Sequence, residues 1–188
     1  MVINYFGDGC FRLQSGGTSL LVDPNNNRLK ADVVLKTLIS TDAPAAAPNE
    51  VSSPGEYEIK DIQIQGWPVP KESTEKFLKT VYLVTWEDMN FVFLGHLSNG
   101  LEPEILEEFG ESNVLFAPIG GGHFLSGEAA AKLAKKLEPS AVIPCFFKTP
   151  NEFLKAIGQK AEAQEKFVFK KRDLDGLKTK AIILKSAD

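Results

Sequence analysis

Residues 31–43 read ADVVLKTLISTDA and carry the strongest single indication of the architecture. Within them, Val33–Ile39 is a mainly apolar run of strand length, which predicts a strand buried on both faces. Residues 43–49 are rich in alanine and proline and have neither strand nor helix character. The sequence therefore predicts a buried strand that runs into a loop.

Short strands separated by tight turns are predicted on both sides of this stretch. Residues 57–65 alternate apolar and polar side chains after Ile59, which indicates one half-buried antiparallel strand. Residues 87–90 are expected to form the turn of a hairpin. The strands predicted in this half are Val2–Phe6, Cys10–Gln14, Ser19–Asp23, Val33–Ile39, Tyr57–Gln65, Thr80–Trp86 and Phe91–Leu94.

Helices and strands alternate in the second half of the chain. Ser126 is expected to cap a helix that Pro139 stops. The other predicted elements are helices at Pro103–Phe109 and Asn151–Ile157 and strands at Val114–Ala117, Ala141–Phe147, Phe167–Phe169 and Lys180–Lys185. Strands followed by βα units predict a layered α/β sandwich. No linker divides the sequence, so we expect one domain spanning residues 1–188.

Composition excludes several classes of protein. The net charge of −4 argues against a nucleic-acid partner, which requires a basic surface. No apolar run approaches the length of a membrane span, and residues 1–6 read as a strand rather than a signal peptide. Cys10 and Cys145 suggest no disulfide scaffold. We therefore expect a cytoplasmic protein without a membrane partner.

Six further segments, in order along the chain, are similar to sequence motifs of one known family. Together they resemble a small zinc-dependent hydrolase branch of the metallo-β-lactamase fold. The matching segments are Gly7–Phe11 (family G-H-S-C-F), Leu21–Pro24 (ending D-P), Ser53–Ile59 (P-G-E-Y-E-I), Leu94–Leu97 (L-G-D-L), Pro118–Phe124 (P-V-G-G) and Val142–Lys148 (V-I-P-M-H-Y-K). The resemblance covers essentially the whole chain and implies a four-layered αββα sandwich.

The same resemblance locates the family's metal ligands on this sequence. The family motif T-H-x-H-x-D-H begins at Thr37 and continues through Asp42, and three further ligands follow later in the chain. The seven places fall on Leu38, Ser40, Asp42, Ala43, Lys71, His96 and Phe146. Only Asp42 keeps the family's residue, so the resemblance implies a scaffold whose metal site is degenerate.

Counting residues leads to the same expectation. A catalytic zinc takes about three protein ligands, and a binuclear site needs more. This chain contains two histidines, His96 and His123, with no H-x-H pair and no C-x-x-C motif. We expect no metal and no other cofactor. The alternative is a single zinc held by Asp42, His96 and His123.

The remaining candidate residues have either a structural or a functional interpretation. His96 and His123 are either ordinary loop residues or residues of the former cleft, where His96 could act as acid or base. Gly120–Gly122 is either a packing turn or an anion-binding nest. Ser40, His96 and Asp42 could be assembled into a serine triad only if the geometry brought them together. No catalytic residue is assigned with confidence from the sequence.

One ion pair is predicted inside the vestigial cleft. A carboxylate deprived of its metal still requires a counter-charge or water, so Lys71 is expected to pair with Asp42. Asp8, at a place where the family often has histidine, would add another carboxylate. Leu38 and Phe146 are expected to fill the former metal cavity with apolar atoms.

Three functions are consistent with these observations. The favoured hypothesis is a non-catalytic pseudoenzyme that acts as a binding or interaction module for an unknown small molecule or protein, with a homo-oligomer also possible. The second is a metal-dependent hydrolase with an altered or mononuclear site. The third is an anion or nucleotide binder that uses Gly120–Gly122.

Overall fold

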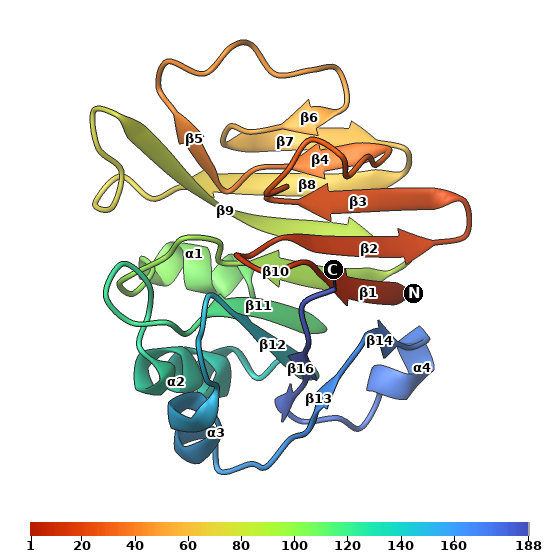
Figure 1. The fold of residues 1–188 in the computed structure, drawn as a ribbon, viewed down its shortest axis with the longest axis vertical. Helices are drawn as coiled ribbons and strands as arrows, with labels where there is room; N and C mark the ends of the chain where they lie inside the picture. The colour runs from red at the N-terminus through yellow and green to blue at the C-terminus, as the bar shows by residue number, and fades with distance from the viewer. Residues whose placement is uncertain (188) are drawn as a thin grey trace.

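The computed structural model describes residues 1–187, which form two stacked β-sheets with helices packed against one of them (Figure 1). The six-stranded sheet has the order β14 (Phe167–Val168), β1 (Val2–Tyr5), β2 (Phe11–Ser15), β3 (Thr18–Val22), β4 (Val33–Leu35) and β6 (Glu50–Val51). The eight-stranded sheet has the order β15 (Lys180–Ala181), β12 (Ala141–Cys145), β11 (Val114–Pro118), β10 (Met89–Phe93), β9 (Phe77–Trp86), β8 (Ile62–Pro68) and β7 (Gly55–Ile59), and β5 (Leu38–Ser40) pairs with the start of β9. A small third sheet joins β13 (Ala163–Gln164) to β16 (Ile183–Leu184).

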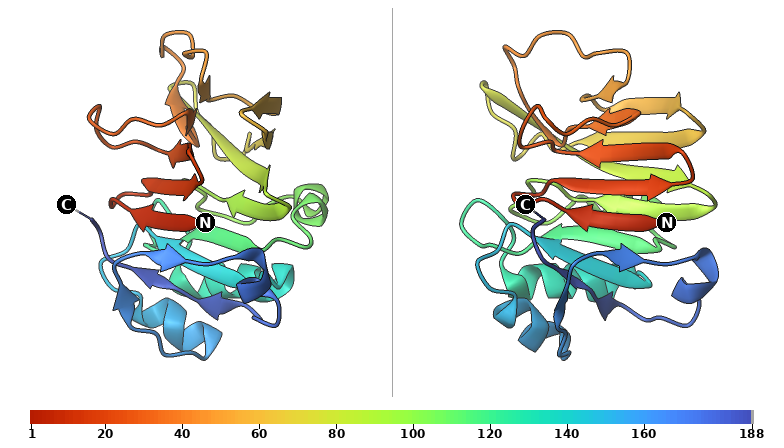
Figure 2. Two further views of the ribbon diagram at one scale, coloured as in Figure 1. Left: turned by 90° about the vertical axis from the view of Figure 1, so that its right-hand side faces the viewer. Right: turned by 45° about the vertical axis from the view of Figure 1, so that its right-hand side comes forward.

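The main core lies between the two large sheets (Figure 2). Alternate side chains of β1 to β4 point into it and meet alternate side chains of β8 to β12. Aromatic rings fill its centre, where Phe116 stacks on Phe93 at 4.3 Å and packs edge-on against Phe11 at 4.7 Å. Five of the thirteen phenylalanines are buried in this core between the sheets: Phe11, Phe91, Phe93, Phe116 and Phe169.

A second core covers the opposite face of the eight-stranded sheet. Three helices supply it from outside: α1 (Pro103–Glu108), α2 (Gly127–Leu137) and α3 (Asn151–Ile157). α2 begins as predicted, because the Ser126 side chain accepts a hydrogen bond from the backbone N–H of Ala129. The short helix α4 (Lys171–Leu174) was not predicted, and it contributes Leu174 to the core between the sheets. The structure therefore has the stacked sheets of the predicted α/β sandwich, with three helices on the outer face of the eight-stranded sheet.

Two strands predicted from hydrophobic pattern are each divided in the structure. Tyr57–Gln65 turns back on itself at Lys60 and Asp61, which both adopt positive φ, so β7 and β8 form a hairpin. Val33–Ile39 breaks at Lys36 and Thr37, and its two halves, β4 and β5, pair in different parts of the fold. Alternation and apolarity continue across both breaks, which is why the pattern alone did not predict them.

The two ends of the described chain are held at opposite ends of β1. The N-terminal ammonium of Met1 donates to the carbonyl of Phe169 at 2.8 Å. The backbone N–H of Ala187 donates to the carbonyl of Tyr5 at 2.7 Å, beside an isolated parallel bridge between Tyr5 and Ser186.

Within residues 1–187, no helix has the length and apolarity that crossing a bilayer would require.

Gly66 in β8 provides a test of the sheet packing. A Cβ at this position would lie 2.6 Å from the ring of Tyr82, the fully buried residue opposite it on β9. We expect Gly66→Ala to lower the free energy of unfolding by about 1–3 kcal/mol, because overpacking displaces a buried ring. Urea denaturation measures this change.

Gly17→Ala is the matched control, because a Cβ there meets nothing within 4 Å. It should change the unfolding free energy by no more than about 0.5 kcal/mol. Equal effects of the two substitutions would contradict the packing argument.

Candidate functional site

A buried carboxylate lies where β3 ends. Asp23 accepts a hydrogen bond from the backbone N–H of Thr37 at 2.7 Å and a second from the Thr37 hydroxyl at 2.5 Å. Burial raises the pKa of Asp23 to about 6, although the two bonds from Thr37 act in the opposite direction. The interaction holds the break between β4 and β5 against the end of β3. In the sequence, Asp23 stands out only as part of an Asp-Pro strand end, and it was not among the residues predicted to line the cleft.

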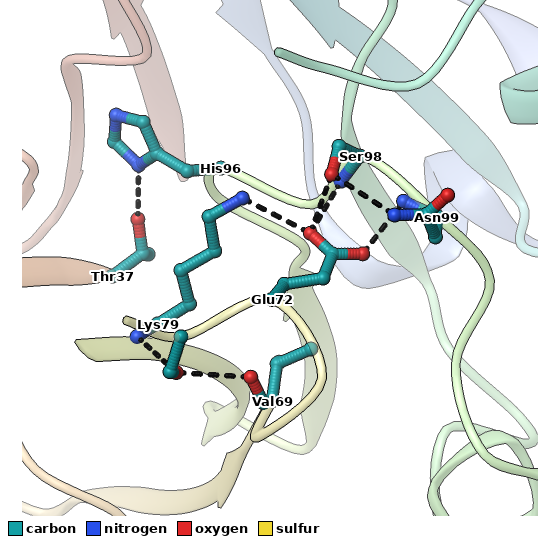
Figure 3. A network of polar contacts seen from close by, with 8 residues as sticks. Thr37, Val69, Glu72, Lys79, His96, Ser98 and Asn99 are labelled. Carbon is teal, nitrogen blue, oxygen red and sulfur yellow. Dashed lines mark hydrogen bonds and ion pairs between the residues drawn. The ribbon is translucent and has the colours of Figure 1, made fainter. Parts of the chain in front are cut away.

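His96 continues this chain of contacts from the loop after β10. Its Nδ1 lies 3.0 Å from the Thr37 hydroxyl oxygen (Figure 3). Burial and, to a smaller extent, the nearby ammonium of Lys79 lower the pKa of His96 to about 4. His96 is therefore neutral at pH 7. Asp23, Thr37 and His96 form a linear polar chain that connects both sheets at one end of the sandwich.

Gly95 makes this close approach possible. It adopts a φ of +54°, and a side chain at this position would collide with the side chain of Thr37. Thr37 is itself almost fully buried, with 1% of its surface exposed. The turn before His96 is thus shaped to place the imidazole on the threonine hydroxyl.

An aromatic stack packs against the imidazole of His96. The ring of Phe146 lies 4.8 Å from that of His96 and stacks on Phe124 at 4.2 Å. Phe146 follows β12 directly and adopts a φ of +54°, a conformation that costs energy for a bulky residue. A strained aromatic residue therefore occupies the place where the family resemblance puts a histidine ligand.

Two glycines accommodate Phe146. A side chain at Gly9 would collide with the Phe146 ring, and one at Gly120 would collide with the Phe146 carbonyl oxygen. Gly9 is the residue where the resembling family motif G-H-S-C-F has serine. The presence of Phe146 thus depends on glycine at position 9.

A buried acidic network fixes the loop that carries His96 (Figure 3). The carboxylate of Glu72 accepts hydrogen bonds from the backbone N–H groups of Ser98 and Asn99 at 2.8 and 2.6 Å, and from the Ser98 hydroxyl at 2.8 Å. Lys79 forms an ion pair with the same carboxylate at 3.0 Å. Hydrogen bonds from Ser98 and Lys79 offset the burial of Glu72, so that its pKa lies below its usual range.

Two depressions lie at this end of the sandwich, one lined in part by His96 and the other by Phe146. The smaller has a volume of about 350 Å³ and is lined by Asp8, Asp23, Pro24, Asn25, Lys36, Leu38, Ile39, Ser40, Ala43 and His96. The larger, of about 1110 Å³, contains Asp8, Gly120–Gly122, His123, Phe124, Phe146 and Lys148 in its lining. Asp8 belongs to both. The structure thus collects most of the predicted cleft residues at one end of the sandwich.

Two of the predicted cleft residues lie elsewhere, and the predicted ion pair is wrong. Lys71 pairs with Glu102 at 2.6 Å and lines a separate depression near α1. Asp42 is exposed and makes no ion pair with any residue in 1–187. Asp42 lines neither of the two depressions and Lys71 lines a third, so the aspartate and the lysine do not converge. The hypothetical serine triad of Ser40, His96 and Asp42 is not formed either. The carboxylate nearest to His96 is that of Asp23, which reaches it through Thr37.

The side chains present do not fit a binuclear metal centre. Zinc sites draw three or four convergent nitrogen, sulfur or oxygen ligands. Within the described part of the chain, no three His, Cys, Asp or Glu side chains come together in such a group. His123 lines the larger depression, and His96 the smaller one. Nδ1 of His96 lies 4.0 Å from the Asp23 carboxylate and already forms a hydrogen bond with the Thr37 hydroxyl.

Both cysteines are free and buried in the core. Burial raises the pKa of Cys10, and that of Cys145 lies well above its ordinary value for the same reason. Both thiols therefore stay protonated near neutral pH.

Comparison with known proteins identifies the family. The model of the beta-lactamase superfamily domain matches residues 2–146, and the chain belongs to this family. A metallo-beta-lactamase superfamily structure from Thermotoga maritima superposes with a TM-score of 0.77 at 24% identity, covering 97% of each chain. An isothiocyanate hydrolase from Delia radicum gut bacteria gives a TM-score of 0.63 at 11% identity over 100% of this chain and 98% of that one. The predicted α/β fold of metallo-β-lactamase type is confirmed.

One relative found by sequence comparison has a name that describes an activity. A metal-dependent hydrolase from Thermococcus onnurineus is 26% identical over 113 residues, which is 55% of this chain. The match spans 50% of that relative.

The interdependence of Gly9 and Phe146 can be measured by a double-mutant cycle. We expect Gly9→Ala to lower the unfolding free energy by about 2–3 kcal/mol, through the clash with the ring and the positive φ of Gly9. In a Phe146→Ala background the clash is gone and only the backbone cost of the left-handed conformation remains. The coupling energy should be about 1–2 kcal/mol. Additive effects would contradict direct packing of the ring on Gly9.

The buried pair also predicts a specific pH dependence. The pKa of Asp23 is raised from 3.8 to about 6, so its contribution to stability is lost as the pH rises through this range. The pKa of His96 is lowered from 6.5 to about 4, so its contribution is lost as the pH falls through that range. The two effects oppose each other between about pH 4 and 6.5 and leave a small net slope.

His96→Asn removes one of the two opposing effects. The difference in unfolding free energy, wild type minus variant, should rise with pH between 4 and 6.5 by on the order of 2–3 kcal/mol. Denaturant titrations at several pH values measure it, and groups common to both proteins cancel. A flat difference would show that His96 titrates normally in the folded protein.

Proposed function

We propose that this chain is a binding protein built on the metallo-β-lactamase fold, and that its cleft takes a small molecule without the metal pair of the family. The carrying observation is the position of Phe146, whose ring lies against His96 and over Gly9. A ring in that place supplies no ligand and excludes one. The depression of about 350 Å³ beside it keeps polar groups in its lining and has room for a small ligand.

The polar contacts around the cleft support this proposal. Metal ions in such sites commonly connect loops that would otherwise separate. Here, the loop that carries His96 is held by Thr37 and by the Glu72 carboxylate, which are contacts between protein groups alone. These contacts hold the loop through protein groups, which supports a cleft that works without a metal.

A mononuclear metal-dependent hydrolase is the second candidate. It is favoured by the presence of His96, Asp8 and Asp23 in the lining of the same depression, and by the name of the curated relative. Function resides in the site rather than in the fold, so the name alone does not decide between the two.

Metal content distinguishes the two candidates. The purified full chain is incubated with excess Zn²⁺ or Fe²⁺, passed through a desalting column and assayed for bound metal by mass spectrometry. We expect far less than one equivalent of either metal in the wild-type protein, because its side chains do not converge.

His96→Ala is the matched variant for this measurement, since it removes the one histidine of the smaller depression. Any residual metal should be the same in both proteins. One equivalent of zinc or iron in the wild type that disappears in His96→Ala would overturn the binding proposal and establish the mononuclear site.

A further inference from the structure

The hydrogen-bond chain at the site fixes which nitrogen of His96 carries the proton. Above about pH 6, Asp23 is ionised and can only accept hydrogen bonds. Thr37 has one hydroxyl proton, which it donates to Asp23 at 2.5 Å. Its oxygen can then only accept from His96, so Nδ1 carries the proton across the 3.0 Å contact.

The second ring nitrogen is consequently a free acceptor. Nε2 points away from Thr37 (Figure 3) and has no hydrogen-bond partner among residues 1–187. The His96 side chain is 21% exposed, and His96 lines the smaller depression. A neutral imidazole with its lone pair directed away from its anchor is suited to bind a hydrogen-bond donor.

The charges around the depression indicate the kind of donor. Asp8 and Asp23 contribute two carboxylates to the lining. Asp8 is exposed, and no side chain in the described part of the chain pairs with it. The one lysine of the lining, Lys36, already forms an ion pair with Glu50 at 2.9 Å. The depression therefore favours a cation.

The apolar part of the lining limits the size and character of the ligand. Pro24, Leu38, Ile39 and Ala43 contribute aliphatic surface beside the polar groups. A short alkyl chain could contact these residues while its charged end faced Asp8 and His96. The combination of acceptor, negative charge and aliphatic wall matches one class of compound.

We propose that the smaller depression binds a small primary alkylammonium compound, whose N–H groups donate to Nε2 of His96 and whose charge is balanced by Asp8. Asp23 and Thr37 are positioning residues, since they set the tautomer of His96 and do not touch the ligand. This inference rests on the proposed function, because it requires the cleft to be free of metal.

The tautomer is tested first, in the ligand-free protein. Nitrogen-15 NMR of histidine-labelled full chain at pH 7.5 distinguishes protonated from unprotonated ring nitrogens. We expect Nδ1–H in the wild type, and a loss of this preference in Thr37→Val, which keeps the shape of the side chain and removes the hydroxyl. An Nε2–H tautomer in the wild type would overturn the inference.

Binding is then tested with ethylammonium chloride as the probe and tetraethylammonium chloride as its control at equal ionic strength. Both are cations, and only ethylammonium has N–H donors. Ethylammonium should shift the Nε2 resonance of His96 in a saturable manner, whereas tetraethylammonium should leave it unchanged. Equal responses to the two salts would overturn the proposed hydrogen bond.

Two exposed aspartates provide a matched pair of variants. Asp8→Asn should weaken ethylammonium binding at least about tenfold, as expected for loss of a charged hydrogen-bond partner. Asp61→Asn removes the same charge at a residue that also has positive φ, φ +59° against +47° for Asp8, and should leave the affinity unchanged. Similar losses in both variants would indicate a nonspecific effect of net charge and overturn the assignment of Asp8.

The metal assay keeps the two proposals separable. Failure of ethylammonium to bind, with zinc still far below one equivalent, overturns the ligand class alone. Stoichiometric zinc that depends on His96 overturns the proposed function and the ligand class together.

Discussion

The hydrogen bonds that Thr37 donates to Asp23 are the interaction on which this end of the molecule depends. Apolar burial holds the two sheets together over most of their length, but it weakens where strands end and polar loops begin. Asp23 follows β3, Thr37 separates β4 from β5, and His96 follows β10. The contacts of Thr37 with Asp23 and His96 therefore connect three chain segments from both sheets. Breaking a buried contact of this kind is expensive, because it leaves a desolvated charge without its donors.

The remaining contacts of the site build on that anchor. Glu72 holds the loop after β10 through backbone N–H groups, which fixes the position of His96 without constraining its side chain. The rings of Phe146 and Phe124 then pack against the imidazole. Thr37, Glu72 and the two phenylalanines thus provide three separate contacts, which together hold the loop that carries His96.

Much of the fold could be predicted from the sequence, and less of the site. Helix α3 and the cap at Ser126 follow from local chemistry, and they appear as predicted. The break at Thr37 could not be predicted, because it serves a contact with Asp23, fourteen residues earlier, and local apolarity continues through it. Asp23 itself was hidden in an Asp-Pro strand end. The prediction for Lys71 was wrong because a family position fixes a place in the sequence alignment, while the direction of an exposed side chain depends on neighbours such as Glu102.

The fit between Gly9 and Phe146 makes two positions that lie far apart in the sequence a single unit of packing. A side chain at position 9 would collide with the ring, and a smaller residue at position 146 would leave a void beside the glycine. A change at either position is therefore accommodated better when the other changes with it. The lining at this end of the cleft can thus be altered with least loss of stability by paired substitutions, whereas single substitutions are costly at both positions.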